Sequence, residues 1–407
     1  MTITLGDIED ARRVIKDTVL RTPMLPAPKL SALTGAQVFV KYENLQVTNS
    51  FKDRGALVKL ASLSEAERKR GVIAMSAGNH AQAVAYHAAR LKIPATIVMP
   101  VTTPFVKVAA TRSHGARVVL HGDSVGDAQA RVDELASQRG YVEVHPYNDA
   151  RIVAGQGTVA LEILEDVSDL DCLVVPIGGG GLISGNAIAA RAKRPGIEIV
   201  GVEAALYPSM WNAVHGGSKP AGGPTLAEGI AVKQVSGLTV GIVREFVAGI
   251  LLVGEAELER AVNAYVTLQK TVAEGAGAAG LAALLAEPER FKGRKVGLIL
   301  SGGNIDPRIL ASITVRELER EHRIVSFRLT LPDQPGALGP IATKLGELGA
   351  NILEVDHRRL FLDVPAKGAR LDVTVETRDG AHADEIMQAL AESGYQPVRI
   401  AAGAAME

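Results

Sequence analysis

The regular alternation of short apolar runs with longer amphipathic stretches over residues 1–314 constrains the fold more than any other feature of this chain. The runs rich in Val and Ile are expected to be strands: Gln37–Glu43, Val72–Met75, Ala95–Met99, Ala116–Leu120, Tyr141–Val144, Cys172–Pro176, Glu198–Glu203 and Lys295–Leu300. Helical stretches lie between them, for example Ala81–Leu91, Asp127–Arg139 and Ala256–Gln269. Because such strands alternating with helices form parallel sheets covered on both faces, we predict an α/β domain. The units are too many for one small sheet, so two lobes are expected.

A smaller pattern follows a charged segment that has no apolar stripe. Residues 315–324 are predicted to be a solvated helix end or linker, and residues 325–407 a separate domain. The expected elements of this domain are strand, helix, strand, strand, helix and strand: Val325–Leu331, Gly336–Gly349, Asn351–Leu362, Ala369–Arg378, Ala381–Gly394 and Gln396–Ala401. This βαββαβ order is that of a ferredoxin-like fold.

Charge and composition exclude several classes of protein. The formal net charge of −1 offers no basic field to nucleic acid or to anionic lipid. The N-terminus lacks the pattern of a signal peptide, and no apolar run approaches the ~20 residues that span a bilayer. The single cysteine, Cys172, excludes an internal disulfide and is expected to be a buried, inert thiol. These features predict a cytoplasmic protein that binds neither nucleic acid nor membrane.

The strongest local motif is the segment Asn49–Ala56, which reads NSFKDRGA. Asn49 or Ser50 can cap the helix that follows, which would place Lys52 in its first turn. The helix dipole disfavours positive charge there, which would lower the pKa of Lys52 and suit a lysine that acts as a neutral amine. By itself, the segment fits a surface lysine after a helix cap better.

Four consecutive glycines form the second motif, after the strand-like run at 172–176. They are Gly178, Gly179, Gly180 and Gly181, and a helix is expected to begin near Leu182. Glycines let backbone N–H groups close around an anion, and the helix N-terminus adds partial positive charge. We predict a phosphate-binding loop, with a flexible turn as the alternative.

Two further motifs also follow expected strands. The first, Ser76, Ala77, Gly78, Asn79 and His80, has small residues before a helix N-terminus and suits a substrate carboxylate. Asn79 can also donate to a phenolic oxygen, whereas a histidine such as His80 is more often structural than catalytic. The second, Ser301–Asn304, is by itself better explained as a tight turn.

Two further segments match short patterns of other enzyme classes, but the sequence around them does not fit those classes. Gly122–Gly126 fits the G-x-S-x-G pattern of hydrolases, but no convincing acid and histidine follow it. Gly275–Gly280 fits the G-x-G-x-x-G pattern of dinucleotide binding, but it follows a helical run instead of a strand. Neither activity is therefore expected.

Taken together, the four motifs resemble those of the fold type II pyridoxal-phosphate (PLP) enzymes, and most closely the threonine ammonia-lyases. The resemblance covers nearly the whole chain and implies a two-lobed fold like that of tryptophan synthase β, in which a small lobe of about residues 53–150 is inserted in the larger one. It implies that Lys52 forms a Schiff base with PLP, that Phe51 packs on the cofactor ring, and that the glycine loop holds the phosphate. It further implies that Asn79 contacts the ring hydroxyl and that Ser301 bonds the ring nitrogen. The segments at 227–232 and 274–277 also resemble the surroundings of this site.

The implied reaction is the dehydration and deamination of L-threonine to 2-oxobutanoate and ammonia, with L-serine as a secondary substrate. A neutral hydroxyl at Ser301 would leave the ring nitrogen unprotonated, which favours β-elimination over transamination. The alternatives are an L-serine dehydratase or serine racemase, and an amino-acid-binding regulatory protein whose catalytic lobe has decayed. Racemases of this kind usually carry a serine where this chain has Ala77. Their divalent-metal site usually pairs a glutamate, here Glu203, with an aspartate where this chain has Ser209, so no metal is expected.

Residues 325–402 resemble an ACT domain, a module that binds amino acids at interfaces between copies. The typical Asp-x-Pro-Gly-x-Leu loop is present here as Asp333, Gln334, Pro335, Gly336, Ala337 and Leu338. A plain turn between strand and helix would contain the same residues. The resemblance implies a homodimer or homotetramer regulated by a branched-chain amino acid, with isoleucine as the first expectation.

Overall fold

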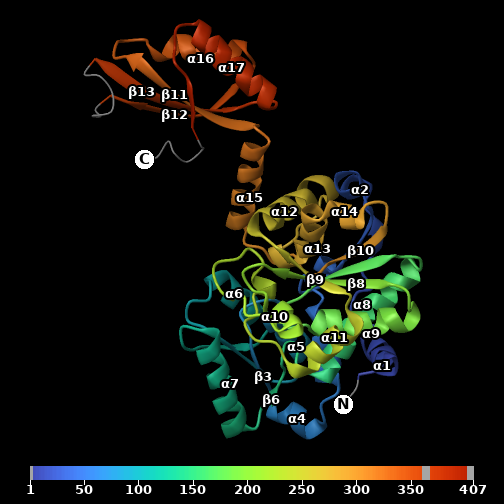
Figure 1. Ribbon diagram of the computed structural model, residues 1–407. Coiled ribbons are helices and arrows are strands. Elements are labelled where there is room, and N and C mark those ends of the chain that lie inside the picture. Colours follow the sequence, from blue (N-terminus) through green and yellow to red (C-terminus); the bar gives the residue numbers. More distant parts are fainter. Residues whose placement is uncertain (1–2, 360–366, 401–407) are drawn as a thin grey trace. The chain divides into compact units, whose positions relative to one another are not determined.

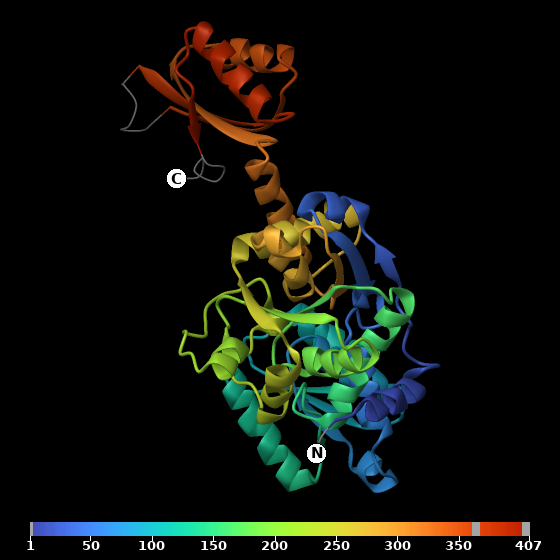
Figure 2. The ribbon, with the colours of Figure 1, turned by 45° about the vertical axis from the view of Figure 1, so that its right-hand side comes forward.

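The computed structural model describes residues 3–359 and 367–400 and divides into two compact units, Met1–Ile305 and Asp306–Glu407. Figure 1 shows the elements of both units, and Figure 2 shows them from a second direction. No helix in the described ranges is both long and apolar enough to cross a bilayer. The sequence had placed the end of the first domain at residue 314.

The first unit contains a six-stranded sheet in the order β1-β2-β10-β7-β8-β9. Its strands are β1 (Met24–Pro26), β2 (Gln37–Tyr42), β7 (Cys172–Pro176), β8 (Glu198–Ala204), β9 (Gly249–Val253) and β10 (Lys295–Leu300). All neighbours are parallel except the short edge strand β1, which runs antiparallel to β2. Sequence analysis missed β1 and β9. Cys172 is buried in β7, and burial raises the pKa of its thiol to about 12.

A four-stranded parallel sheet, in the order β5-β4-β3-β6, forms the smaller lobe of the first unit. Its strands are β3 (Val72–Met75), β4 (Ala95–Met99), β5 (Arg117–Leu120) and β6 (Val142–Glu143). The helices of this lobe are α4 (Glu65–Arg70), α5 (Asn79–Arg90), α6 (Phe105–Ser113) and α7 (Val125–Arg139). Two apolar clusters cover its two faces, so the α/β fold with two lobes is confirmed.

The remaining helices of the first unit pack mainly around the larger sheet. They are α1 (Leu5–Ile15), α2 (Pro28–Thr34), α3 (Lys52–Ala61), α8 (Ala150–Asp166), α9 (Gly181–Lys193), α10 (Ser209–His215), α11 (Gly237–Phe246), α12 (Glu255–Gln269), α13 (Gly275–Ala286) and α14 (Pro288–Phe291). Two short 3-10 helices, η1 (Glu43–Leu45) and η2 (Glu228–Ile230), lie in its loops.

Glycines allow α8 to pack directly against both α3 and α9. A Cβ on Gly155 of α8 would lie 2.6 Å from the Cα of Gly55 on α3. A Cβ on Gly185 of α9 would lie 2.2 Å from the carbonyl oxygen of Val153. Any larger side chain would push the helices apart. Because α3 begins at Lys52 and α9 begins at the glycine loop, this packing sets the distance between the two motifs.

The second unit is a sheet in the order β12-β13-β11-β14, with all pairs antiparallel. Its elements are α15 (Pro307–Arg320), β11 (Ile324–Pro332), α16 (Leu338–Glu347), β12 (Asn351–Arg358), β13 (Gly368–Glu376), α17 (Gly380–Glu392) and β14 (Val398–Ile400). Figure 2 shows α16 and α17 on the same face of this sheet, where one apolar cluster forms the core. The predicted ferredoxin-like βαββαβ order is confirmed, while the predicted strand ends at residues 360–362 and 401 lie outside the described residues.

Of the two alternatives for residues 315–324, a solvated helix end or a linker, the structure shows a helix end over residues 315–320. Residues 315–320 form the last turns of α15, and only residues 321–323 separate that helix from β11. The high charge of this segment agrees with an exposed helix end, because a helix with few buried residues can carry charge around most of its surface. Ile313 is the buried residue of α15.

Candidate active site

Three of the four motifs follow the carboxyl ends of parallel strands, one in the smaller sheet and two in the larger, and open α/β folds bind their ligands at such strand ends. The segment 76–80 follows β3, the glycine loop follows β7, and Ser301 follows β10. The loop before Lys52 is tied to the end of β10, since the backbone N–H of Phe51 donates to the carbonyl oxygen of Ser301 at 3.0 Å. Ser50 also pairs with Gly302 in an isolated antiparallel bridge.

Lys52 is the first residue of α3, in the first helical turn as predicted. Its Nζ lies 3.1 Å from the carbonyl oxygen of Pro146 and 5.1 Å from the centroid of the Phe51 ring. Burial lowers the pKa of this amine to about 8, although the carboxylate of Glu274 acts in the opposite direction. The predicted cap was wrong: Phe51 occupies the N-cap position without a side-chain hydrogen bond, and Asn49 adopts a positive φ of 57°.

The glycine loop forms a tight turn into α9. Gly180 takes a φ of 90°, a conformation that favours glycine, and α9 follows directly. A Cβ on Gly179 would lie 2.1 Å from the ring of Tyr147, and one on Gly180 would lie 2.6 Å from Met210. Thr239 Oγ1, on helix α11, donates to the carbonyl oxygen of Gly179 at 2.8 Å and so fixes the backbone of the loop. The amides of a loop at the start of a 13-residue helix suit a phosphate group.

Asn79 begins α5, and its side chain lies between two other motifs. Its Nδ2 donates to Glu274 Oε1 at 2.6 Å, and its Oδ1 accepts from Asn304 Nδ2 at 2.8 Å. Asn304 Nδ2 also donates to the carbonyl oxygen of Thr48, just before the lysine motif. Sequence analysis gave neither partner of Asn79, because no local pattern links residues that lie 195 and 225 positions away.

The side chain of His80 is buried and bonded to the backbone. Its Nε2 donates to the carbonyl oxygen of Val144 at 2.6 Å, and burial lowers its pKa to about 3. A neutral, bonded imidazole of this kind joins α5 to the segment after β6 and leaves only its backbone for a ligand. The preceding loop is ordered by Ser76 Oγ, which accepts from the N–H of Gly78 at 3.2 Å, while Ala77 is partly exposed there.

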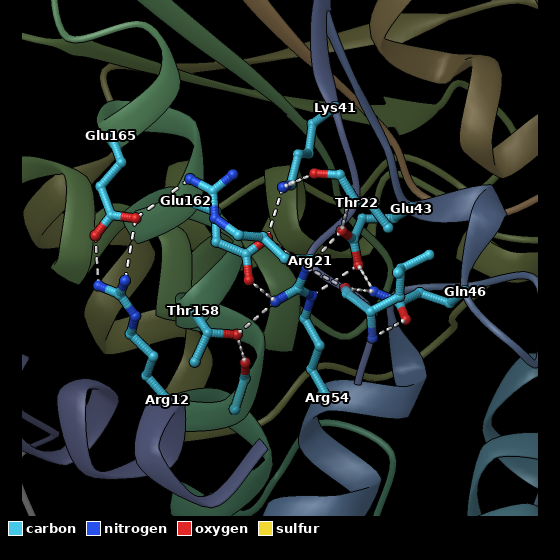
Figure 3. A network of polar contacts seen from close by, with 12 residues as sticks. Arg12, Arg21, Thr22, Lys41, Glu43, Gln46, Arg54, Thr158, Glu162 and Glu165 are labelled. Atoms are coloured by element: carbon cyan, nitrogen blue, oxygen red, sulfur yellow. Dashed lines mark hydrogen bonds and ion pairs between the residues drawn. The ribbon is translucent and has the colours of Figure 1, made fainter. Parts of the chain in front are cut away.

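A buried ionic network anchors the helix that carries Lys52 (Figure 3). The guanidinium of Arg54 donates to both oxygens of Glu43 and to both oxygens of Glu162, at 2.7–2.8 Å. Lys41 Nζ also bonds Glu162, at 2.6 Å, so two cations face two carboxylates. Although burial acts against it, the charge of Arg54 holds the pKa of Glu43 below its usual value. The network therefore joins α3, α8 and the end of β2 in the protein interior.

The carboxylate of Glu203 is bonded by backbone amides. Its Oε1 and Oε2 accept from the backbone N–H groups of Met210 and Trp211 at 2.7 and 2.8 Å, at the start of α10. Burial raises its pKa to about 7. Ser209 Oγ donates to the carbonyl oxygen of Val232. Within residues 3–359 and 367–400, no group of three or more His, Cys, Asp or Glu side chains is placed to hold a metal ion.

In the second unit, the loop 333–338 joins β11 to α16. Gly336 adopts a positive φ of 80°, and Ala337 is the N-cap residue of the helix. Asp333 donates its backbone N–H to the carbonyl oxygen of Lys367 at 2.9 Å, and its carboxylate lies 3.5 Å from Arg359. A Cβ on Gly336 would meet no atom within 4 Å, so the loop is open at this position, just before a ten-residue helix.

Residues 15–302 match the family described as pyridoxal-phosphate dependent enzyme. That match covers most of the chain and contains the first three motifs together with Ser301 and Gly302 of the fourth. The chain belongs to the family of pyridoxal-phosphate-dependent enzymes, and pyridoxal phosphate is its cofactor.

Individual members of this family show which enzymes the chain is similar to. The chain is 44% identical to the L-threonine ammonia-lyase of Thermotoga maritima, over 98% of this chain and 99% of the relative. Threonine deaminase isoform 2 from Solanum lycopersicum is 35% identical, with a TM-score of 0.72 over 76% of this chain and 86% of that structure. Maize serine racemase is 32% identical, also with a TM-score of 0.72, over 79% of this chain and all of that structure.

The residues present fit the cofactor. A partly buried lysine with a lowered pKa provides the amine, and the glycine loop at the start of α9 provides backbone donors for a phosphate. A Cβ at any of Gly178, Gly179 or Gly180 would collide with or crowd a neighbouring residue, so only glycine leaves this loop its path. Phe51, beside the amine, offers an aromatic face for a ring.

Proposed function

We propose that this enzyme dehydrates and deaminates L-threonine to 2-oxobutanoate and ammonia, with L-serine as a slower substrate. The observation that carries the proposal is the setting of the Lys52 amine. The preceding residue, Phe51, is bonded to Ser301. Lys52 Nζ lies 3.1 Å from the carbonyl oxygen of Pro146, and the next residue, Tyr147, packs against Gly179 of the glycine loop. Near full-length similarity to an L-threonine ammonia-lyase supports the choice of reaction.

Each motif has a distinct part in this reaction. When bound, the cofactor withdraws electrons from the Cα–H bond of the amino acid that it holds. Lys52, neutral above about pH 8, accepts the Cα proton, while the glycine loop binds the phosphate and Asn79 the ring hydroxyl. Ser301 presents a hydroxyl to the ring nitrogen, and a hydroxyl does not stabilise positive charge there as a carboxylate would. The segment 76–80 binds the substrate carboxylate through backbone N–H groups.

The proposal is tested directly by incubating the PLP-loaded protein with L-threonine and measuring 2-oxobutanoate and ammonia. The expected result is equal amounts of the two products, because each molecule of threonine gives one molecule of 2-oxobutanoate and one of ammonia. L-Serine should give pyruvate more slowly. A protein that binds PLP but forms neither oxo acid would contradict the proposal and favour a regulatory, amino-acid-binding role.

Ala77 should make racemisation slow, and this distinguishes the proposed ammonia-lyase from a serine racemase. A methyl group cannot donate or accept a proton on the face of the substrate opposite Lys52. With L-serine, the enzyme should therefore form pyruvate at least about tenfold faster than D-serine, because a proton-transfer group typically contributes about 10²–10⁴-fold. D-Serine formation as fast as pyruvate formation would show that another residue supplies the second proton.

We further propose that the second unit is an ACT domain that binds a branched-chain amino acid, isoleucine before valine. The loop 333–338 supports this assignment, because its amides at the start of α16 can receive the ligand carboxylate. In this proposal the ligand lies between two copies of the domain, so it acts on a homodimer or homotetramer.

A chain shortened to end at Arg320 should keep threonine turnover and lose its response to isoleucine. Coupling between such sites is typically worth about 1–3 kcal/mol, or about 5–150-fold in apparent affinity. The measurement is the threonine saturation curve of both chains with and without isoleucine. The full chain with Gly336→Val is a second probe, because a β-branched residue is strained at the positive φ of this position. Undiminished isoleucine sensitivity in the shortened chain would place the effector on the first unit.

A further inference from the structure

Two side chains hold the carboxamide of Asn79 in one of its two possible orientations. Glu274 accepts from Nδ2 at 2.6 Å, and Asn304 donates to Oδ1 at 2.8 Å. An ionised carboxylate can only accept hydrogen bonds, so it requires the NH₂ group of Asn79 on its side. The Asn304 amide presents a donor to the other side. Both neighbours therefore favour the same orientation.

Glu274, which bonds Asn79, lies 195 positions later in the sequence. It is the N-cap residue of α13, it is 9% exposed, and its backbone N–H donates to the carbonyl oxygen of Gly302 at 3.1 Å. A Cβ on Gly302 would lie 2.5 Å from Glu274 Oε1. The carboxylate is therefore packed against the turn that follows Ser301, where only glycine leaves room for it. Burial raises the pKa of Glu274 to about 7, although the hydrogen bond from Asn79 and the charge of Lys107 act in the opposite direction, so the carboxylate is ionised above about pH 7 and the tests below are made at pH 8.

We propose that Glu274 is a positioning residue, which orients Asn79 so that its second Nδ2 hydrogen points to the ring hydroxyl of the cofactor. This inference rests on the proposed function, in which Asn79 contacts that oxygen. Nδ2 carries two hydrogens, and the bond to Glu274 uses one of them. If the carboxamide turned over, Oδ1 would face the cofactor oxygen, and two acceptors would oppose each other.

Glu274→Gln tests the role of the carboxylate with almost no change in shape. A glutamine can present either oxygen or NH₂ to Asn79, so it no longer requires one orientation. The variant should bind PLP about tenfold more weakly and show a weaker circular-dichroism signal in the visible band, which reports a fixed cofactor. Glu255→Gln is the matched control, because the Glu255 carboxylate also accepts hydrogen bonds, from Thr225 Oγ1 and the N–H of Leu226, but bonds none of the four motifs. It should bind PLP normally.

A double-mutant cycle shows whether Glu274 acts through Asn79. Asn79→Ala removes the group that Glu274 is proposed to orient, so adding Glu274→Gln to it should weaken PLP binding by less than about twofold further. If the two effects instead multiply, or if Glu274→Gln binds PLP as the wild type does, the proposal is overturned. A direct effect of Glu274 on Lys52 would give the multiplied result, because it does not need Asn79.

Failure of this inference is distinct from failure of the proposed function. The wild-type protein is first reduced with borohydride and the modified lysine located. If PLP is not attached to Lys52, the proposed function is wrong and this inference falls with it. If PLP is attached there and the cycle is multiplicative, only the role of Glu274 is wrong. Fluorescence of Trp211, the single tryptophan, monitors folding of every variant.

Discussion

Lys52→Ala is expected to abolish the covalent attachment of PLP and to lower threonine turnover by at least about 10³-fold. Both effects follow because Lys52 is proposed both to bind the cofactor and to accept the Cα proton, and loss of a proton-transfer group alone costs about 10²–10⁴-fold. The measurement is borohydride reduction followed by peptide mapping, together with the rate of 2-oxobutanoate formation.

Lys59→Ala is the matched control, because Lys59 lies on the same helix and forms an ion pair with Asp149. It should keep the linkage and the turnover. The pH dependence gives an independent check: since burial lowers the pKa of Lys52 to about 8, covalent binding of PLP should speed up with pH and level off above about pH 8. An ordinary lysine would level off above about pH 10. A reducible linkage that survives in Lys52→Ala would contradict the assignment.

Arg54→Met should lower the free energy of unfolding of the first unit by about 3–5 kcal/mol, the largest effect on stability that we expect. The methionine fills similar space but leaves Glu43 and Glu162 with Lys41 as the remaining cation of the network. Urea unfolding followed by Trp211 fluorescence measures the change in this unit alone, because Trp211 lies on α10 of the first unit.

Arg12→Met is the appropriate comparison, since Figure 3 shows Arg12 paired with Glu165 through two bonds as well. That pair is exposed, with 45% of the Arg12 side chain accessible, so its loss should cost less than about 1 kcal/mol. Equal effects of the two substitutions on the free energy of unfolding would mean that burial does not strengthen the network.

The Arg54→Met variant should also hold less PLP, because the network fixes the helix that begins at Lys52.

The sequence by itself determined the α/β alternation, the ferredoxin-like order of the second unit and the position of three of the four motifs directly after a strand. These features are local: the period of apolar residues identifies a strand or helix, and glycines and hydroxyl residues mark its end. The sequence also placed Lys52 in a first helical turn and predicted a lowered pKa from the helix dipole, whereas burial is what lowers this pKa in the structure. It missed β1, whose three residues carry no periodic signal.

Only the tertiary structure decided which side chains meet. Asn79 finds Glu274 and Asn304, both about 200 residues away, and Arg54 finds Glu162, 108 residues away. The predicted cap by Asn49 or Ser50 is absent because the loop before α3 is held by the end of β10 instead. The physical reason is the same in each case: hydrogen bonds and desolvation depend on distance in space, and a local pattern contains no information about distant segments of the chain.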